Sequence, residues 1–279
     1  MKTGAIIQAR MTSTRLPGKV AKELPYGSGI TVLEQVARRL GRCRAVDQVI
    51  VAATTDKADA PLGRLAAKAG AQFFRGSKED VLERYYKAAL KFKLDTVVRI
   101  TSDCPCVDPA LVDDLVAVHR QAGADYTANV VRLTFPDGFD AEVFSFAALK
   151  AAHEQARDKA DREHVTSYLR SHAELFKVVS AEAPAGSRRP DLRVTLDTAE
   201  DYLLLCAVYD NLYAPGRPFG LGEVLRLFAA KPWLEEINRR SLAKKKFASR
   251  REEFRRAVEL LELQELGQAA AALKKLIKK

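Results

Sequence analysis

The residues of this sequence that are best suited to chemistry lie in one short loop, from Gln8 to Lys19. Small hydroxyl side chains and one glycine separate three cations, Arg10, Arg15 and Lys19. Such a loop can surround a triphosphate, because backbone N–H groups and hydroxyls donate hydrogen bonds and the cations neutralise charge. A Walker A loop is excluded, since that motif needs Gly where Ser13 stands and Ser or Thr where Val20 stands. A solvated basic loop is the competing interpretation.

Two aspartates that follow expected strands are candidate metal ligands. Asp103 comes just after a strand expected over residues 96–100, and Asp197 just after one expected over residues 193–196. Mg²⁺ prefers one or two carboxylates together with phosphate oxygens and water. Taken singly, each aspartate is better explained as a turn residue or as a residue at a helix start. Their occurrence together with the basic loop favours a site for a nucleotide and magnesium.

Four strand–loop–helix units in succession must position these residues. We expect strands over residues 4–8, 48–53, 71–74 and 96–100, and helices over residues 31–40, 60–69, 79–92 and 109–121. This alternation predicts an α/β fold with a mostly parallel sheet flanked by helices. Ligands of such sheets bind beyond the carboxyl ends of the strands, which selects the loops 9–19, 54–56, 75–80 and 101–108.

The second half of the chain mixes both kinds of element. We expect strands over residues 126–131, 142–144, 176–180 and 193–196, and helices over residues 145–155, 161–170 and 198–213. Thr198 is the expected N-cap of the last of these helices, with Asp201 three residues further on.

The basic excess of the chain belongs to its C-terminal part. The formal net charge is +10, and residues 239–279 hold 13 basic and 5 acidic side chains, which leaves +2 for residues 1–238. We therefore expect one domain over 1–238 and a basic helical tail over 239–279. The tail could pack on the domain, pair with another subunit or bind an anionic surface.

Composition excludes several classes of protein. Hydrophobic residues make up 47% and charged residues 29% of the 279 residues, which suffices for a large core. No apolar run approaches the ~18 residues of a membrane span, and the short apolar N-terminus is broken by Arg10, so a cytoplasmic protein is expected. A nearly neutral domain also argues against a nucleic-acid-binding surface.

Residues 6–20, IIQARMTSTRLPGKV, closely resemble the signature of the cytidylyltransferases that activate acidic sugars. The branch most similar is that of spore-coat polysaccharide biosynthesis, related to the acylneuraminate and 3-deoxy-manno-octulosonate enzymes. Further similar segments follow in the expected order: VAATTD (51–56), FRGSKEDVL (74–82), VRITSDCP (98–105), FPDGFDAEVF (135–144), REHVT (162–166) and LDT (196–198). The resemblance implies a Rossmann-like nucleotidyltransferase fold.

The resemblance also implies roles for individual residues. The triphosphate would be bound by Arg10, Arg15 and Lys19, and the catalytic residues would be Arg10, Lys19 and Asp103. The base and ribose would lie near Gln8, Ala9, Thr54, Asp56, Ser77 and Asp80. The Mg²⁺ cofactor would be held by Asp103 and Asp197. The acceptor sugar would lie near Asp137, Asp140, Glu142 and His164.

The implied reaction transfers CMP from CTP to an acidic sugar, a nonulosonic or octulosonic acid, and releases pyrophosphate for surface polysaccharide biosynthesis. The sequence does not determine the oligomeric state, but related enzymes are commonly dimers, so the resemblance makes a homodimer possible. The alternatives are GTP or UTP as the nucleotide, another sugar or a phosphonate as the acceptor, and a non-catalytic nucleotide- or nucleic-acid-binding protein. The general base is left open between Asp140, Glu142 and a metal-bound water.

Overall fold

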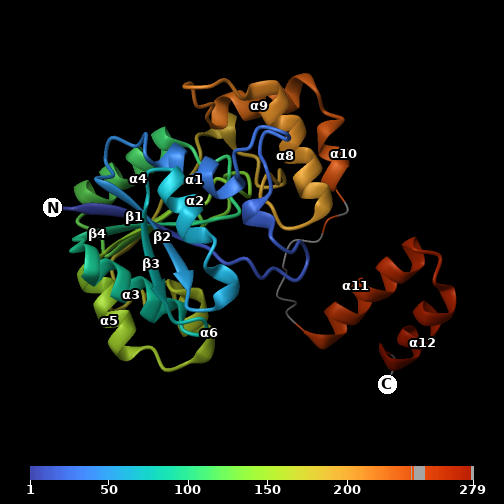
Figure 1. Ribbon diagram of the computed structural model, residues 1–279. Helices are drawn as coiled ribbons and strands as arrows, with labels where there is room; N and C mark the ends of the chain where they lie inside the picture. The colour runs from blue at the N-terminus through green and yellow to red at the C-terminus, as the bar shows by residue number, and fades with distance from the viewer. Residues whose placement is uncertain (240, 242–248, 278–279) are drawn as a thin grey trace. The chain divides into compact units, whose positions relative to one another are not determined.

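The computed structural model describes residues 1–239, 241 and 249–277, and the chain divides into two compact units, Met1–Arg240 and Ser241–Lys279. Within the described residues, unit 1 is built around a seven-stranded sheet with the strand order β3-β2-β1-β4-β6-β5-β7 (Figure 1). No helix in this part of the chain has both the length and the apolar character needed to cross a bilayer.

The first four strands are parallel, as the sequence predicts. They are β1 (Thr3–Gln8), β2 (Gln48–Thr54), β3 (Gln72–Gly76) and β4 (Thr96–Thr101). The last residue of β1, Gln8, pairs with Ala52 of β2 and Thr101 of β4, so the three strands end near one edge of the sheet. The loops selected by the sequence therefore meet at this edge.

The remaining strands make the sheet mixed. Strand β6 (Glu142–Ser145) is antiparallel to both β4 and β5 (Tyr126–Ala128), and β7 (Val178–Ser180) is parallel to β5. Strand β5 ends three residues before the expected position 131. The expectation of a mostly parallel sheet flanked by helices is confirmed.

Helices cover both faces of the sheet because successive strand residues point to opposite sides. On one face, α1 (Val32–Leu40), α2 (Leu62–Lys68) and α4 (Pro109–Ala122) pack on a cluster that includes Ile7 (Figure 1). On the other face, α3 (Val81–Phe92), α5 (Phe146–Gln155) and α7 (Ser167–Ser171) pack on a cluster that includes Ile6.

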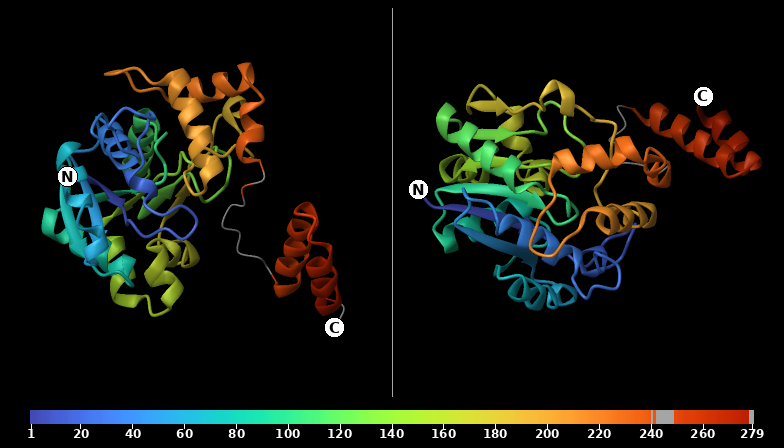
Figure 2. Two further views of the ribbon diagram at one scale, coloured as in Figure 1. Left: turned by 45° about the vertical axis from the view of Figure 1, so that its right-hand side comes forward. Right: turned by 90° about the horizontal axis from the view of Figure 1, so that it is seen from above.

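A third apolar cluster is formed by α8 (Ala199–Leu212), α9 (Leu221–Ala230) and α10 (Leu234–Asn238) with Phe139, Val194 and Leu196. In both views of Figure 2 these helices, drawn in orange, lie at the end of unit 1 that is opposite the N-terminus. Strand β1 begins near the N-terminus and runs toward this end. These helices therefore close the carboxyl edge of the sheet from one side.

Two expected elements differ in the structure. The strand expected over 193–196 is wrong: Arg193 forms only an isolated bridge with Asp137, and the following backbone is bonded to a loop, with Leu196 N donating to Asp103 O. The helix expected over 161–170 is split into α6 (Lys159–His164) and α7, because Val165 adopts a positive φ of 58°.

The described part of unit 2 is a helical hairpin of α11 (Arg250–Leu263) and α12 (Gly267–Ile277). A buried Val258 and a buried Ala270 lie in it, and Lys274 pairs with Glu262. The tail expected over residues 239–279 is therefore helical over residues 250–263 and 267–277, while residues 240, 242–248 and 278–279 lie outside the described residues.

Candidate functional site

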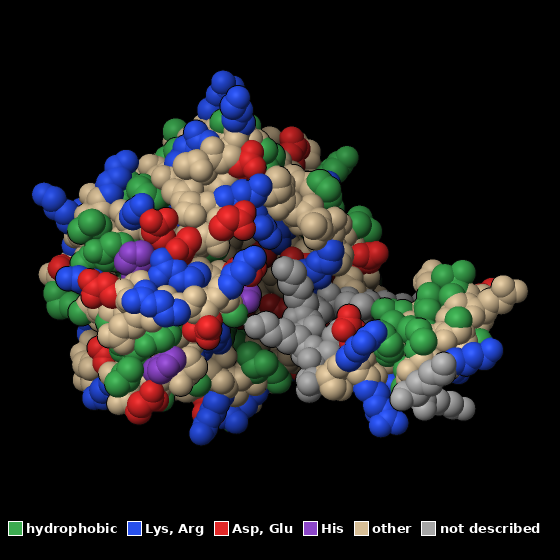
Figure 3. Space-filling view, turned by 90° about the horizontal axis from the view of Figure 1, so that it is seen from below, with side chains coloured by type: hydrophobic (Ala, Val, Ile, Leu, Met, Phe, Trp, Pro, Cys, Tyr) green, Lys and Arg blue, Asp and Glu red, His purple; other side chains and the backbone are tan. Residues whose placement is uncertain are grey.

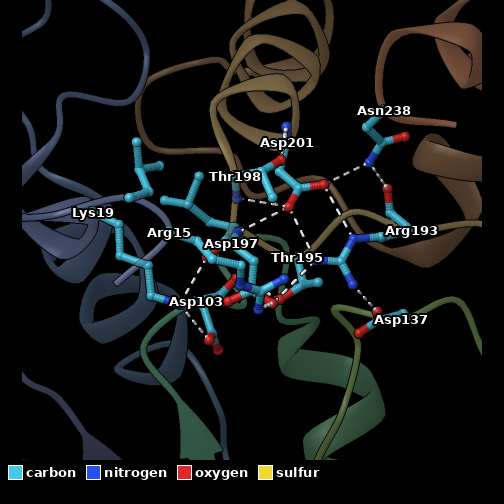
Figure 4. Close-up of polar contacts among 12 residues, drawn as sticks. Arg15, Lys19, Asp103, Asp137, Arg193, Thr195, Asp197, Thr198, Asp201 and Asn238 are labelled. Atoms are coloured by element: carbon cyan, nitrogen blue, oxygen red, sulfur yellow. Dashed lines mark hydrogen bonds and ion pairs between the residues drawn. The ribbon is translucent and has the colours of Figure 1, made fainter. Parts of the chain in front are cut away.

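The ammonium group of Lys19 lies between the carboxylates of Asp103 and Asp197 (Figure 4). Its Nζ is 2.7 Å from Asp103 Oδ2 and 3.0 Å from Asp197 Oδ1, and it donates to the Leu196 carbonyl at 2.8 Å. Lys19 begins a short 3-10 helix, η1 (Lys19–Ala21), at the end of the basic loop, whereas Asp103 follows β4 and Asp197 precedes α8. Three distant parts of the chain therefore meet at one point.

Mutual attraction keeps these groups charged. Burial opposes the charge of Lys19, but Asp103 and Asp197 outweigh it and raise the pKa of Lys19. Burial also favours a neutral Asp197, but Lys19, Arg193 and Arg15 lower its pKa to about 2. Arg15 Nη2 lies 2.8 Å from Asp197 Oδ2. At neutral pH, Lys19 is therefore a cation and Asp197 an anion.

The guanidinium group of Arg193 connects this centre to a second set of carboxylates (Figure 4). It donates to Asp137 Oδ2 at 2.9 Å, to Asp197 Oδ2 at 3.0 Å and to both oxygens of Asp201 at 3.0 and 3.1 Å. The Asn238 amide donates to Asp201 Oδ1 at 2.9 Å. Arg193 therefore ties the segment before α8 to the loop that contains Asp137.

Asp201 fixes the direction in which Asp197 points. Its fully buried carboxylate accepts from the backbone N–H groups of Asp197 and Thr198, each at 3.0 Å. Thr198 Oγ1 accepts from the Asp201 N–H, which completes a capping box at the start of α8. Sequence reasoning missed Arg193, Asp201 and Asn238 as site residues, although opposite charges at positions 193, 197 and 201 were a usable signal.

Gly138 allows the loop of Asp137 to approach the segment of Arg193 closely. Its φ is 111°, and a Cβ atom there would lie 2.7 Å from the backbone carbonyl carbon and oxygen of Val194. Any other residue would force the two segments apart and strain the backbone. The contact is closed by a hydrogen bond from Val194 N to Asp137 O at 2.8 Å.

The basic loop is held at both ends. Met11 N donates to the buried carboxylate of Asp59 at 2.6 Å, and Gly18 N donates to Met11 O at 3.0 Å. Thr54, at the end of β2, also donates its hydroxyl to Asp59. Asp59 is a further residue that sequence reasoning missed. Arg10 is exposed, and no hydrogen bond or ion pair joins its side chain to another described residue.

The residues expected around the base and ribose lie in the loops after β1, β2 and β3. Ala9 is buried directly after β1. Asp56 caps η2 (Lys57–Asp59), and Asp80 caps α3 while it accepts from Arg162 Nε at 2.8 Å. Ser77 Oγ accepts from Asp80 N at 3.0 Å. These polar side chains therefore already shape the loops that surround the edge of the sheet.

Among the residues expected near the acceptor, Glu142 is buried and fully engaged. It pairs with Arg99 and accepts hydrogen bonds from the hydroxyls of Tyr126, at 2.6 Å, and Thr166. Burial acts to raise the pKa of Glu142, but Arg99 and the two hydroxyls lower it. Arg99 also donates to Gln8 Oε1 at 3.3 Å, which links Glu142 to the end of β1.

The other residues expected near the acceptor differ in their surroundings. Asp137 is held by Arg193, and Asp140 is half-buried in the same loop. His164 is exposed at the C-terminal end of α6. Of all the residues selected from the sequence, the structure thus joins five in one polar network: Arg15, Lys19, Asp103, Asp137 and Asp197.

The carboxylates of Asp103 and Asp197 fit a divalent cation. Both converge on one cationic atom, Lys19 Nζ, and they are hard oxygen donors of the kind that Mg²⁺ accepts. Within the described ranges, no cluster of three or more His, Cys, Asp or Glu side chains has metal-binding geometry. Two carboxylates would be the protein's share of such a site, which phosphate oxygens and water would complete.

Comparisons with known proteins relate this chain to cytidylyltransferases. A model of the cytidylyltransferase family matches residues 4–238. The chain is 39% identical over 208 residues to the spore coat polysaccharide biosynthesis protein SpsF of Bacillus subtilis, which covers 74% of this chain and 85% of that relative. It is 28% identical over 184 residues to the 3-deoxy-manno-octulosonate cytidylyltransferase of Geobacter metallireducens, covering 61% of this chain and 70% of that relative.

Among solved structures, a cytidylyltransferase from Leptospira borgpetersenii is similar over 89% of this chain and 100% of its own. The sequence identity is 30% and the TM-score is 0.77.

Proposed function

The chain belongs to the cytidylyltransferase family, and we propose that it transfers the CMP group of CTP to an acidic sugar and releases pyrophosphate. The proposed acceptor is a nonulosonic or octulosonic acid, and the proposed role is the synthesis of surface polysaccharide in the cytoplasm. The similar protein of Bacillus subtilis is a spore coat polysaccharide biosynthesis protein, which supports this role. A homodimer stays a prediction, which analytical ultracentrifugation would test.

The observation that carries the proposal is the position of Lys19 between Asp103 and Asp197 at the carboxyl edge of the sheet. Two carboxylates aimed at one point suit a divalent cation, and the basic loop beside them suits the phosphates that such a cation accompanies. A purely structural ion pair would need neither the exposed Arg10 nor Arg15 beside it.

The residues of the chain would then align the nucleotide and neutralise its charge, which is most of what phosphoryl-transfer chemistry asks of a protein. Arg15 and Lys19 would turn from the carboxylates to the phosphates and stabilise the charge of the leaving pyrophosphate. Arg10 would approach the phosphates from the exposed side of the loop. Bound Mg²⁺, held by Asp103 and Asp197, would withdraw charge from the phosphate oxygens.

Charge distribution disfavours the non-catalytic nucleic-acid-binding alternative. On the face drawn in Figure 3, acidic side chains lie among the basic ones of unit 1, without a continuous basic stripe. Residues 1–238 have a net charge of only +2. Sequence-independent binding of nucleic acid requires that cationic side chains be concentrated on one face of the protein.

The test is a screen for pyrophosphate release with the four nucleoside triphosphates against a panel of acidic sugars, with Mg²⁺. We expect release with CTP and one acidic sugar. Asp103→Asn should lower turnover at least about 100-fold, because half of the proposed metal site is neutralised. Asp191→Asn is the matched control, since Asp191 is exposed and pairs only with Arg189 among the described residues.

Turnover that is equal in Asp103→Asn and the wild type would contradict the proposed site. Release with GTP or UTP in place of CTP would correct the nucleotide. The absence of release with every pair would support a protein that binds nucleotides without catalysis.

A further inference from the structure

Asp140 is half-buried and lies between two fully packed neighbours. Phe139 is 0% exposed and belongs to the cluster under α8 to α10, and Ala141 is 1% exposed and belongs to the cluster on the α1 side of the sheet. No hydrogen bond or ion pair joins the Asp140 carboxylate to another residue in the described part of the chain. An unpaired carboxylate in this position lowers the stability of the fold when it is charged, since buried charges are normally paired.

The backbone on both sides of Asp140 is held by one buried amide. Asn129 follows β5, and its Nδ2 donates to Phe139 O at 2.8 Å while its Oδ1 accepts from Ala141 N at 2.9 Å. One side chain thus fixes the peptide groups before and after Asp140. The backbone from which the Asp140 side chain projects is therefore fixed by packing and by Asn129, without a bond to the carboxylate itself.

The charges around Asp140 are mostly negative. Burial, together with the carboxylates of Asp137, Glu142 and Asp103, raises the pKa of Asp140 to about 7, although Arg99 acts in the opposite direction. The buried thiol of Cys104, from the loop after β4, also senses this charge, and its own pKa is raised by burial. Asp140 can therefore take up a proton near neutral pH, whereas Asp197 cannot.

Glu142 is unsuited to taking up a proton near neutral pH. Both of its oxygens are engaged, by Arg99 on one side and by the hydroxyls of Tyr126 and Thr166 on the other. Its pKa is lowered by these partners, so protonation would break an ion pair and two hydrogen bonds. Of Asp140 and Glu142, only Asp140 has a carboxylate without a partner among the described residues.

We infer that Asp140 is the general base that accepts the proton of the attacking sugar hydroxyl, and that Asn129 is its positioning residue. This inference rests on the proposed function. The hydroxyl oxygen forms a bond to the α-phosphorus of CTP, and its proton passes to a carboxylate oxygen of Asp140. The bond from the α-phosphorus to the bridging oxygen breaks, pyrophosphate leaves with that electron pair, and Asp140 later releases the proton to water.

The experiment compares wild-type enzyme with Asp140→Asn, which keeps the shape of the side chain and removes the base. We expect turnover to fall about 10²- to 10⁴-fold, the usual contribution of a general base, with the KM for CTP within about threefold. Wild-type turnover should decline as pH falls through the pKa of Asp140, and this acid limb should be absent in the variant. Asp140→Ala serves the same comparison if the Asn variant does not fold.

Thermal unfolding across pH separates a base from a merely structural residue. The folded pKa of Asp140 is raised from 3.8 to about 7, so its protonation stabilises the fold at low pH and that stability is lost as pH rises from about 4 to 7. Asp140→Asn should lack this loss and unfold at an equal or higher temperature than wild type at pH 8. A structural carboxylate would show the opposite sign.

The outcomes distinguish the two proposals. If wild-type enzyme is active and Asp140→Asn keeps its turnover and its acid limb, Asp140 is not the base, although the proposed function stands. If wild-type enzyme releases no pyrophosphate with any pair in the screen, the proposed function fails and the inference fails with it.

Discussion

Replacing Lys19 with methionine removes one positive charge while keeping a side chain of similar length. The pKa of Asp197 is lowered from 3.8 to about 2, which corresponds to about 2 kcal/mol of stabilisation. Lys19 is the largest of the three cationic contributors to it, before Arg193 and Arg15. Loss of the Lys19 ammonium group should therefore lower the free energy of unfolding by about 1 kcal/mol through Asp197. The broken ion pair with Asp103 should lower it by a similar amount. Removing the desolvation of the buried ammonium offsets part of this cost.

We therefore expect Lys19→Met to lower the free energy of unfolding by about 1–2 kcal/mol at pH 7 and to lower turnover about 10²- to 10³-fold, as the loss of one preorganised donor does. Urea unfolding and pyrophosphate release measure the two effects. The folded pKa of Asp197 is depressed, so its stabilisation is present above pH 4 and is lost as pH falls through about 2. The stability difference between variant and wild type should shrink over that range.

Lys22→Met is the matched control. Lys22 lies three residues further along the chain, and its ammonium group stands 4.9 Å from the centre of the Tyr202 ring, outside the carboxylate network. It should change turnover less than about threefold. The reasoning would be refuted if Lys19→Met kept wild-type turnover, or if Lys22→Met lost as much activity as Lys19→Met.

Two further substitutions test the frame that holds the site. Asp201→Ala leaves Arg193 without its fully buried partner, and we expect a loss of about 3–5 kcal/mol in urea unfolding; a loss below about 1 kcal/mol would contradict the assigned role. Gly138→Ala places a Cβ atom 2.7 Å from the Val194 carbonyl, and we expect about 1–3 kcal/mol of strain at this positive φ together with reduced turnover. Gly186→Ala, where a Cβ meets nothing within 4 Å, is its control, and equal effects at both glycines would argue against the close approach.

The sequence predicted the parallel half of the fold well because its signals are local. Strands β1 to β4 are short apolar runs, and each is followed by a helix whose apolar face can be recognised from spacing. Handedness and chain order then bring the ends of these strands to one edge. For this reason Lys19 and Asp103 could be selected as neighbours although 84 residues separate them.

The segment before α8 shows where such reasoning stops. Residues 193–196 have the composition of a strand, yet their backbone bonds to the loops of Asp137 and Asp103, and no described strand lies beside them. The pairing partners of an isolated segment depend on the packing of distant loops, which composition does not encode. Val165 is a similar case, since a β-branched residue at positive φ is imposed by its surroundings.

By itself, the sequence determined the order of strands and helices in the first half of the chain, the family and the side chains available at the sheet edge, because periodicity and motifs are properties of neighbouring residues. Only the tertiary structure decided which of those side chains are paired with one another and which are left without a partner. It placed Arg193, Asp201 and Asn238 as a frame around Asp197, it engaged Glu142 completely, and it left Asp140 without a partner among the described residues. Charge and burial depend on every group within a few ångströms, and those groups come from segments far apart in the chain.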